Sequence, residues 1–131
     1  MKILVVEDDF ASRRMMQKIL AEFGDVDVVV DGMEALDAFS LAWEEASPYD
    51  LIFMDIMMPK MDGQEALKRI REMENKIGVS PVDEVKVIMT TVMEDPKSVI
   101  QAFQEGAASA YLVKPISLEA IKKEIGKLKI T

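Results

Sequence analysis

The sequence predicts an α/β fold, a doubly wound sheet of five parallel strands with helices on both faces. Five short apolar runs are each followed by a segment whose apolar residues recur at helical spacing, so strands and helices alternate along the chain. The first and third runs are continuously apolar, as is typical of strands buried on both faces. Alternation of this kind indicates parallel strands connected by right-handed crossovers.

The N-terminal part of the chain is expected to contain two strands and two helices. A buried strand over residues 2–6 precedes a helix over 10–23, for which Gly24 is the expected C-cap. Residues 25–30 first alternate between aspartate and valine, which indicates an edge strand guarded by charge. A second helix is expected over 33–46. The apolar residues expected on the buried faces of these helices are Met15 or Met16, Ile19, Leu20, Phe23, Leu36, Phe39 and Trp43.

The stretch from Tyr49 to Gly63, with the sequence YDLIFMDIMMPKMDG, lies at the centre of the predicted fold. Its apolar run over residues 51–54 indicates a buried strand that delivers one carboxylate, Asp55, to its C-terminal end. Asp62 is placed to cap a following helix, with Glu65 three residues later as in a capping box. The apolar face expected for this helix consists of Leu67, Ile70, Met73 and Ile77.

The C-terminal part of the chain is expected to add two further strand and helix units after a loop over 78–84. A fourth strand spans 85–89, and Asp95 followed by a proline is typical of a helix start, with that helix ending near residue 105. A fifth strand spans 110–113, and Ser117 is placed to cap the last helix. The apolar face expected for that helix consists of Leu118, Ile121, Ile125 and Leu128.

Polar and charged residues of interest follow the first, third, fourth and fifth predicted strands. In open parallel sheets the C-terminal ends of the strands share one edge, and ligands bind there. We therefore expect these side chains to converge, although each of them alone is more often a capping or solvated group. The residues concerned are Glu7, Asp8 and Asp9 after the first strand, Asp55 after the third, Thr90 and Thr91 after the fourth, and Lys114 after the fifth.

This set of residues is suited to phosphoryl chemistry assisted by a metal ion. Crowded carboxylates repel one another, and a small dication such as Mg2+ relieves that repulsion while keeping several waters among its oxygen ligands. A lysine is suited to pairing with a phosphate oxygen, and a threonine hydroxyl to donating to another. The nucleophile would be a carboxylate oxygen of Asp55, which would form an acyl phosphate.

The composition excludes several other classes of function. The 131 residues suit a single domain, and half of them are hydrophobic, which is enough for a sizeable core. The chain has no histidine and no cysteine, which excludes serine–histidine triads, the usual zinc sites, disulfides and thiol chemistry. The net charge of −8 argues against a nucleic-acid surface. No apolar run approaches the roughly 20 residues of a membrane span, and the acidic N-terminal MKILVVEDD does not resemble a signal peptide. We therefore expect a cytoplasmic protein that binds neither nucleic acid nor membrane.

Five pieces of the sequence together resemble the receiver domain of two-component response regulators, in particular the single-domain regulators of chemotaxis. The pieces are VVEDD, DIMMPKMDG, the threonine pair, Tyr111 and the Lys114-Pro115 dipeptide. The resemblance implies a receiver domain over residues 1–131 with the flavodoxin-like strand order 2-1-3-4-5. It also implies a signalling phosphoacceptor rather than an enzyme, in which Asp55 receives a phosphoryl group from a histidine kinase or a histidine phosphotransfer protein.

The resemblance further implies a role for each site residue. Mg2+ would be held by Asp8, Asp55 and the main-chain carbonyl of Met57, with Glu7 acting through a water molecule. Asp9 has a competing assignment as the N-cap of the first helix, to which we give at least equal weight.

Around the phosphoryl group, the resemblance implies that Lys114 binds it and that Thr91 donates a hydrogen bond to it. Tyr111 would be the aromatic switch that turns inward when Thr91 moves, and the peptide bond between Lys114 and Pro115 would be cis. Thr90 is expected to be structural. The active state would bind a downstream protein target or relay the phosphoryl group, because the chain ends after the last helix without an effector domain.

Two departures from the family pattern affect the expected behaviour. Met57 and Met93 occupy the positions two residues after Asp55 and Thr91, where receivers often carry polar side chains that orient an attacking water. The resemblance implies self-catalysed phosphorylation, and because of the two methionines we expect autodephosphorylation to be slow. Glu94 and Asp95 are neighbours of Met93 in the sequence and could compensate. The segment over 106–111 is also one residue longer than the usual spacing.

Three other functions are weighed against this interpretation. A phosphatase with an aspartate nucleophile would need a second acid two residues after Asp55, where the chain has Met57. A flavodoxin would need a hydroxyl- and glycine-rich phosphate loop after the first strand, where the chain has the acidic EDD sequence. A receiver-like module that binds proteins without phosphorylation stays open as the alternative.

Overall fold

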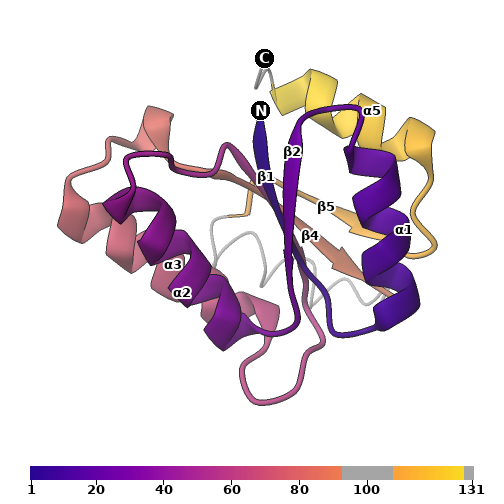
Figure 1. The fold of residues 1–131 in the computed structure, drawn as a ribbon, viewed down its shortest axis with the longest axis horizontal. Coiled ribbons are helices and arrows are strands. Elements are labelled where there is room, and N and C mark those ends of the chain that lie inside the picture. Colours follow the sequence, from indigo (N-terminus) through magenta and orange to yellow (C-terminus); the bar gives the residue numbers. More distant parts are fainter. Residues whose placement is uncertain (93–107, 129–131) are drawn as a thin grey trace.

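The computed structural model describes residues 1–92 and 108–128. These residues form a five-stranded parallel sheet in the order β2-β1-β3-β4-β5 (Figure 1). The predicted fold class and strand order are therefore confirmed, and β2 is an edge strand as its aspartates indicated. The strands are β1 (Lys2–Val6), β2 (Asp25–Val29), β3 (Leu51–Asp55), β4 (Lys86–Thr91) and β5 (Ala110–Val113).

Helices cover both faces of the sheet. Helices α2 and α3 lie together on one face, and helices α1 and α5 lie on the other (Figure 1). Their bounds are α1 (Phe10–Leu20), α2 (Gly32–Glu44), α3 (Gly63–Ile77) and α5 (Leu118–Leu128), with a 3-10 turn, η1 (Pro81–Asp83), inside the predicted loop. The helix predicted over 95–105 lies outside the described residues. Within the described ranges, no helix is long and apolar enough to cross a membrane.

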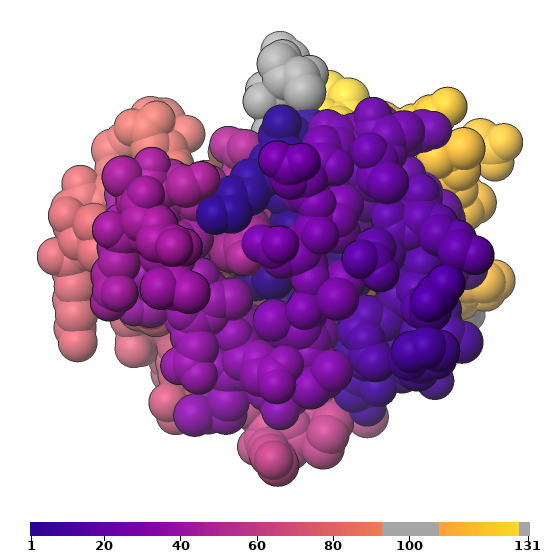
Figure 2. Space-filling view, viewed as in Figure 1, coloured from indigo at the N-terminus to yellow at the C-terminus, as the bar shows by residue number. Residues whose placement is uncertain are grey.

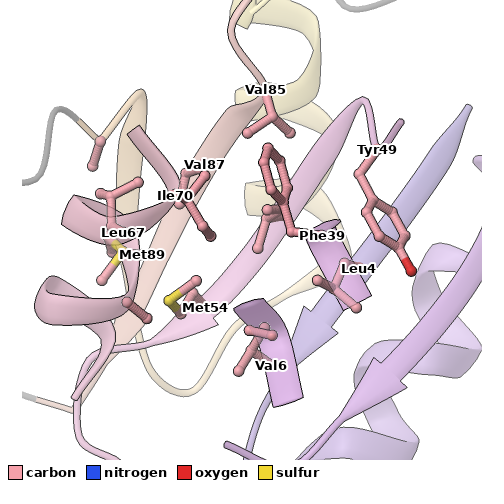
Figure 3. Close-up of a cluster of buried hydrophobic side chains, with 14 of the residues drawn as sticks. Leu4, Val6, Phe39, Tyr49, Met54, Leu67, Ile70, Val85, Val87 and Met89 are labelled. Atoms are coloured by element: carbon pink, nitrogen blue, oxygen red, sulfur yellow. The ribbon is translucent and has the colours of Figure 1, made fainter. Parts of the chain in front are cut away.

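The sheet packs against the helices through two hydrophobic clusters, one on each face. The larger cluster lies between the sheet and the α2–α3 layer, where Met54 and Met89 of the sheet face Phe39 of α2 and Leu67 of α3 (Figure 3). The smaller cluster lies between the sheet and helices α1 and α5. Every residue of β3 is buried because both clusters contact this central strand. The continuous apolar run in the sequence is thus explained by two-sided burial.

The first helix is shorter than predicted, and Gly24 is not its C-cap. Helix α1 ends at Leu20, with Ala21 as the C-cap. Gly24 instead lies where the chain passes the N-terminus, and the main-chain N–H of Asp25 donates to the carbonyl oxygen of Met1 at 2.9 Å. A Cβ atom on Gly24 would collide with that carbonyl oxygen, so the position requires a glycine for close approach rather than for a helix end.

The buried faces of the helices differ in part from the predicted ones. In α3 the buried side chains include Ala66 and Glu74, whereas Ile77 is 49% exposed at the C-terminal end of the helix. In α2 the small residues Ala35 and Ala42 are buried beside Phe39, while Leu36 and Trp43 pack at the margin of the larger cluster. Small residues let a helix approach the sheet closely, which moves larger neighbours to the margin. Of the alternatives Met15 and Met16 on α1, Met16 is buried and Met15 is exposed, and Leu118 of α5 is exposed as well.

The remaining boundaries follow the predictions closely. Asp62 caps α3, its carboxylate accepting from the main-chain N–H of Glu65 at 2.8 Å, and the Ser117 hydroxyl oxygen accepts from Ala120 at the start of α5. Strand β4 runs to Thr91, two residues beyond the predicted end. The loop between β3 and α3 projects at the C-terminal edge of the sheet, and it also stands out in the space-filling view (Figures 1 and 2).

Candidate functional site

Three carboxylates meet at the C-terminal edge of the sheet. Oxygen atoms of Glu7, Asp8 and Asp55 all lie within 4.8 Å of one another. Glu7 and Asp55 are buried, whereas Asp8 is exposed. Glu7 and Asp8 directly follow β1, and Asp55 ends the adjacent strand β3. The structure therefore brings together three of the predicted acids because neighbouring parallel strands end at the same edge.

The main chain after β3 holds the Asp55 side chain in place. Oxygen Oδ1 of Asp55 accepts a hydrogen bond from the main-chain N–H of Met57 at 3.1 Å. Gly63 packs against the carbonyl group of Asp55 so closely that a Cβ atom there would collide with it. The N–H of Gly63 also donates to the carbonyl oxygen of Ile56 at 2.9 Å. Strand, loop and start of α3 thus form one compact support for the carboxylate.

Lys114 joins two of the acids through its ammonium group. The distance from its Nζ to Glu7 Oε2 is 2.7 Å, and the distance to Asp55 Oδ2 is 3.1 Å. The Lys114 N–H donates to the carbonyl oxygen of Thr91 at 2.7 Å, and the peptide bond to Pro115 is cis, as predicted. Lys114, which follows β5, therefore crosses beyond the end of β4 to the acids that follow β1 and β3.

The site changes the protonation equilibria of its members. Burial lowers the pKa of Lys114, but hydrogen bonding to Glu7 and the charge of Asp55 outweigh burial and raise it above the ordinary value. Burial raises the pKa of Glu7, and the hydrogen bond from Lys114 opposes that shift without cancelling it. Three carboxylates against one ammonium group leave the cluster with net negative charge, which favours binding of a cation.

The carboxylate of Asp9 is not part of this cluster, although the Asp9 main-chain N–H donates to Glu7 Oε1 at 3.1 Å. Its carboxylate oxygen Oδ2 accepts from the main-chain N–H of Ser12 at 2.9 Å, so Asp9 is the N-cap of α1. This hydrogen bond lowers the pKa of Asp9. The capping assignment is therefore confirmed, and the sequence EDD divides into two residues at the site and one at the helix.

The two threonines at the end of β4 face opposite sides of the sheet. Thr90 lies in register with Asp55, and Thr91 with Val113. Alternation along the strand puts Thr91 on the same face as Met89, which belongs to the larger cluster against which Tyr111 packs. Thr90 faces α1 instead. Both threonines are buried, and Tyr111 is half-buried.

Arg13 is a site residue that the sequence reasoning missed. Its Nη1 donates to the main-chain carbonyl of Glu7 at 2.9 Å and to that of Asp8 at 3.3 Å. The guanidinium group therefore ties the first turn of α1 to the acidic segment after β1. Its spacing of four residues from the Asp9 cap was a possible signal, because that spacing returns a helical side chain to the helix start.

Comparisons with known proteins agree with this geometry. The family model of the response regulator receiver domain matches residues 3–126. The chemotaxis protein CheY of Bacillus subtilis (strain 168) is 34% identical over 126 residues, which cover 96% of this chain and 95% of CheY. The probable histidine kinase 2 of Oryza sativa subsp. indica is 35% identical over 95% of this chain, but the matched part is only 12% of that kinase.

A solved structure extends the similarity to the fold. The receiver domain of the histidine kinase CKI1 from Arabidopsis thaliana, complexed with Mg2+ and BeF3−, has a TM-score of 0.83 and 29% identity. The match covers 99% of this chain and 90% of that structure. Receiver domains bind Mg2+ at an acidic site and interact with histidine kinases or phosphotransfer proteins. The chain belongs to the response regulator receiver domain family, the phosphoacceptor domains of two-component signalling.

Proposed function

We propose that Asp55 accepts a phosphoryl group from a phosphohistidine on a histidine kinase or histidine phosphotransfer protein. The observation that carries this proposal is the position of Lys114, whose ammonium group lies 3.1 Å from the Asp55 carboxylate inside a cluster of three acids. An oxygen of Asp55 forms a bond to phosphorus while the bond from phosphorus to the imidazole nitrogen breaks. The electron pair of that bond returns to the imidazole, and Asp55 becomes an acyl phosphate.

The acidic cluster fits Mg2+. Carboxylate and carbonyl oxygens are the ligands that this ion prefers, and the excess of negative charge in the cluster needs a cation. Asp8, Asp55 and the main-chain carbonyl of Met57 would hold the ion, with Glu7 acting through water. When bound, Mg2+ supplies positive charge next to the transferred phosphoryl oxygens.

Lys114 and Thr91 give the phosphorylated state its preference for a second conformation. The phosphoryl group offers new acceptor oxygens to the ammonium group of Lys114 and to the hydroxyl group of Thr91. Tyr111 lies on the same face of the sheet as Thr91, so a movement of Thr91 opens space for its ring. Changing the ratio of active to inactive conformation from 1:99 to 99:1 needs about 5.5 kcal/mol of differential stabilisation. A few charge-assisted hydrogen bonds to the phosphoryl group approach this value. The resulting surface around Tyr111 binds a downstream target.

Acetyl phosphate with Mg2+ tests the proposed function directly. We expect intact-protein mass spectrometry to detect one added phosphoryl group on the wild-type protein and none on the Asp55→Asn variant. The variant keeps the size of the side chain but lacks the nucleophilic carboxylate. A wild-type protein that gains no mass would contradict the proposal and favour a phosphorylation-independent binding module. A mass gain retained in Asp55→Asn would assign the acceptor role to another residue.

The Asp8→Asn variant should bind Mg2+ more weakly than the wild-type protein. Asp8 is the exposed acid of the cluster, and its loss removes one anionic oxygen ligand. We expect the affinity to fall by at least about tenfold, the lower end of the loss caused by removing outer-shell partners of metal sites. Isothermal titration with MgCl2 measures the change. Asp83→Asn, far along the chain in η1, is the control, and an equal loss in both variants would contradict the assignment.

The phosphorylated protein should lose its phosphoryl group slowly. Met57 is 57% exposed beside the site, and a thioether is too weak an acceptor to orient an attacking water. Met93, the second methionine of this argument, lies outside the described residues. We expect the Met57→Asn variant to dephosphorylate faster in excess Mg2+, as followed by loss of the added mass over time. A wild-type lifetime of seconds would contradict the expectation.

A further inference from the structure

A cavity of about 270 Å3 lies on the α1 side of the sheet, next to the acidic cluster. Its walls are mainly apolar and include Val5, Met16, Phe53 and Ile116. The cavity reaches the surface beside Met15 and Val92, which are 41% and 68% exposed. An apolar protein cavity of about 150 Å3 is large enough to hold benzene. The space here therefore admits a molecule with one ring or a short branched chain.

Thr90 provides an uncommitted polar group in the cavity wall. The residue is only 4% exposed, yet no hydrogen bond of its hydroxyl group is found within residues 1–92 and 108–128. Its hydroxyl oxygen is not fully enclosed by protein atoms, so it can be reached from the cavity that the residue lines. Its neighbour Thr91 does not share this environment, because it faces the other side of the sheet. The Thr90 hydroxyl group is thus available to a molecule that enters the cavity.

The charges around the cavity restrict the kind of molecule that fits. Glu7 and Lys114 also contribute to the wall, and they already form an ion pair of 2.7 Å with each other. A carboxylate inside the cavity would meet Glu7, with Asp55 and Asp8 close behind it. A ligand with an ammonium group would lose its hydration among apolar side chains. It would also find the Glu7 carboxylate already paired with Lys114. An uncharged polar group meets neither penalty.

We propose that this cavity binds a compact uncharged amphiphile, an apolar molecule that carries one hydroxyl group. The apolar part of the ligand fills the space between α1 and the sheet. The hydroxyl group of the ligand forms a hydrogen bond with the Thr90 hydroxyl group. Sites for small molecules are typically apolar with a few placed polar groups, as this one is. The site is distinct from the proposed phosphoacceptor carboxylate, and its binding is measured without any phosphodonor, so either proposal can fail independently.

Amide NMR titrations of the 15N-labelled protein test the proposal with a set of single-ring probes. Benzyl alcohol should produce saturable shifts at Thr90, Met16 and Ile116, whereas benzoate and benzylammonium should bind at least about tenfold more weakly because of the cost of burying charge. Toluene is the probe without a hydroxyl group. The Thr90→Val variant should weaken benzyl alcohol binding about fivefold, the value of one hydrogen bond, and leave toluene binding unchanged.

The Thr90→Ser variant keeps the hydroxyl group and should keep the preference for benzyl alcohol over toluene. Unshifted amide signals away from the cavity would establish that both variants fold. Shifts confined to the exposed Met15 and Val92 would identify an apolar surface for a partner protein and would overturn the proposal. It would also be overturned by equal binding of all probes, by equal losses in the two variants, or by the absence of saturable shifts, which would leave water as the only occupant.

Discussion

The Lys114→Met substitution is expected to lower the free energy of unfolding by about 2–3 kcal/mol when no metal is present. Lys114 contributes the ammonium group that contacts both Glu7 and Asp55. Methionine keeps much of the apolar stem but leaves two buried carboxylates facing each other without a cation. Breaking a buried pair costs more, but 20% of the Lys114 side chain is exposed and water screens part of the effect.

Urea unfolding at neutral pH, followed by the fluorescence of the single tryptophan Trp43, measures this loss. Saturating Mg2+ should restore part of it in the variant, because the ion neutralises the same carboxylates. Lys127→Met is the matched control. Lys127 pairs with Glu124 at 3.6 Å, but its side chain is 58% exposed, so its loss should change stability by less than about 0.5 kcal/mol. Equal effects of the two substitutions would contradict the assigned role of Lys114.

The stability difference between the wild-type protein and Lys114→Met should depend on pH in alkaline solution. The pKa of Lys114 is raised above its ordinary value of 10.5, so the folded state binds that proton more tightly than the unfolded state. Its stabilising contribution is therefore complete below pH 10.5 and is lost as the pH rises through the raised value. The stability difference between wild type and Lys114→Met should shrink over that range. Burial also raises the pKa of Tyr49, but this affects both proteins equally.

The position of the site could be predicted from the sequence because it depends on topology alone. Once residues 2–6 and 51–54 are recognised as buried parallel strands, Glu7, Asp8 and Asp55 must emerge at one edge. The residue that follows β5 reaches the same edge by the same argument, which places Lys114 there. The strand order itself required the resemblance, since periodicity does not determine which strands are neighbours.

The partners within the site could not be predicted, because they depend on the directions of individual side chains. Three acids and one lysine allow several pairings. Only the structure shows that Lys114 forms ion pairs with both Glu7 and Asp55. Asp9 was equally suited to the metal or to the helix until the geometry of α1 assigned it to the cap. Arg13 was missed because its guanidinium group binds main-chain carbonyls, and the type of residue that supplies a carbonyl does not show in the sequence. Its spacing from the Asp9 cap was the one available signal.

For Glu74 the sequence-based prediction was wrong in a different way, because a charged residue is buried where apolar residues were expected. The helical pattern pointed to Met73 and Ile77 as the buried residues near the end of α3, but Glu74 is 1% exposed and Ile77 is 49% exposed. The carboxylate of Glu74 accepts from Arg71 Nη1 at 2.8 Å and from the main-chain N–H of Val85 at 2.7 Å. Binary patterning cannot reveal a buried carboxylate that is paired with an arginine of its own helix and with a main-chain N–H of the next segment.

The Glu74→Ala variant should therefore lose about 3–5 kcal/mol of stability, as expected when one member of a buried ion pair is removed. The substitution leaves the Arg71 guanidinium group without this carboxylate, and it leaves the buried N–H of Val85 without its acceptor just before β4. Arg71 Nη1 also donates to the carbonyl oxygen of Val85 at 2.8 Å, so the change disturbs the whole connection between α3 and β4. Urea unfolding measures the loss.

Two further variants test whether the stability loss in Glu74→Ala comes from the buried hydrogen bonds, from a change in helix propensity or from the loss of charge alone. Glu74→Gln keeps an oxygen acceptor and most of the volume, so it should lose only about 1–2 kcal/mol. Glu65→Ala makes the same change on the exposed side of the same helix, where Glu65 pairs with Arg69 at 3.1 Å, and should stay within about 0.5 kcal/mol of the wild-type protein. A loss in Glu74→Ala no larger than in Glu65→Ala would mean that the connection between α3 and β4 does not depend on this carboxylate.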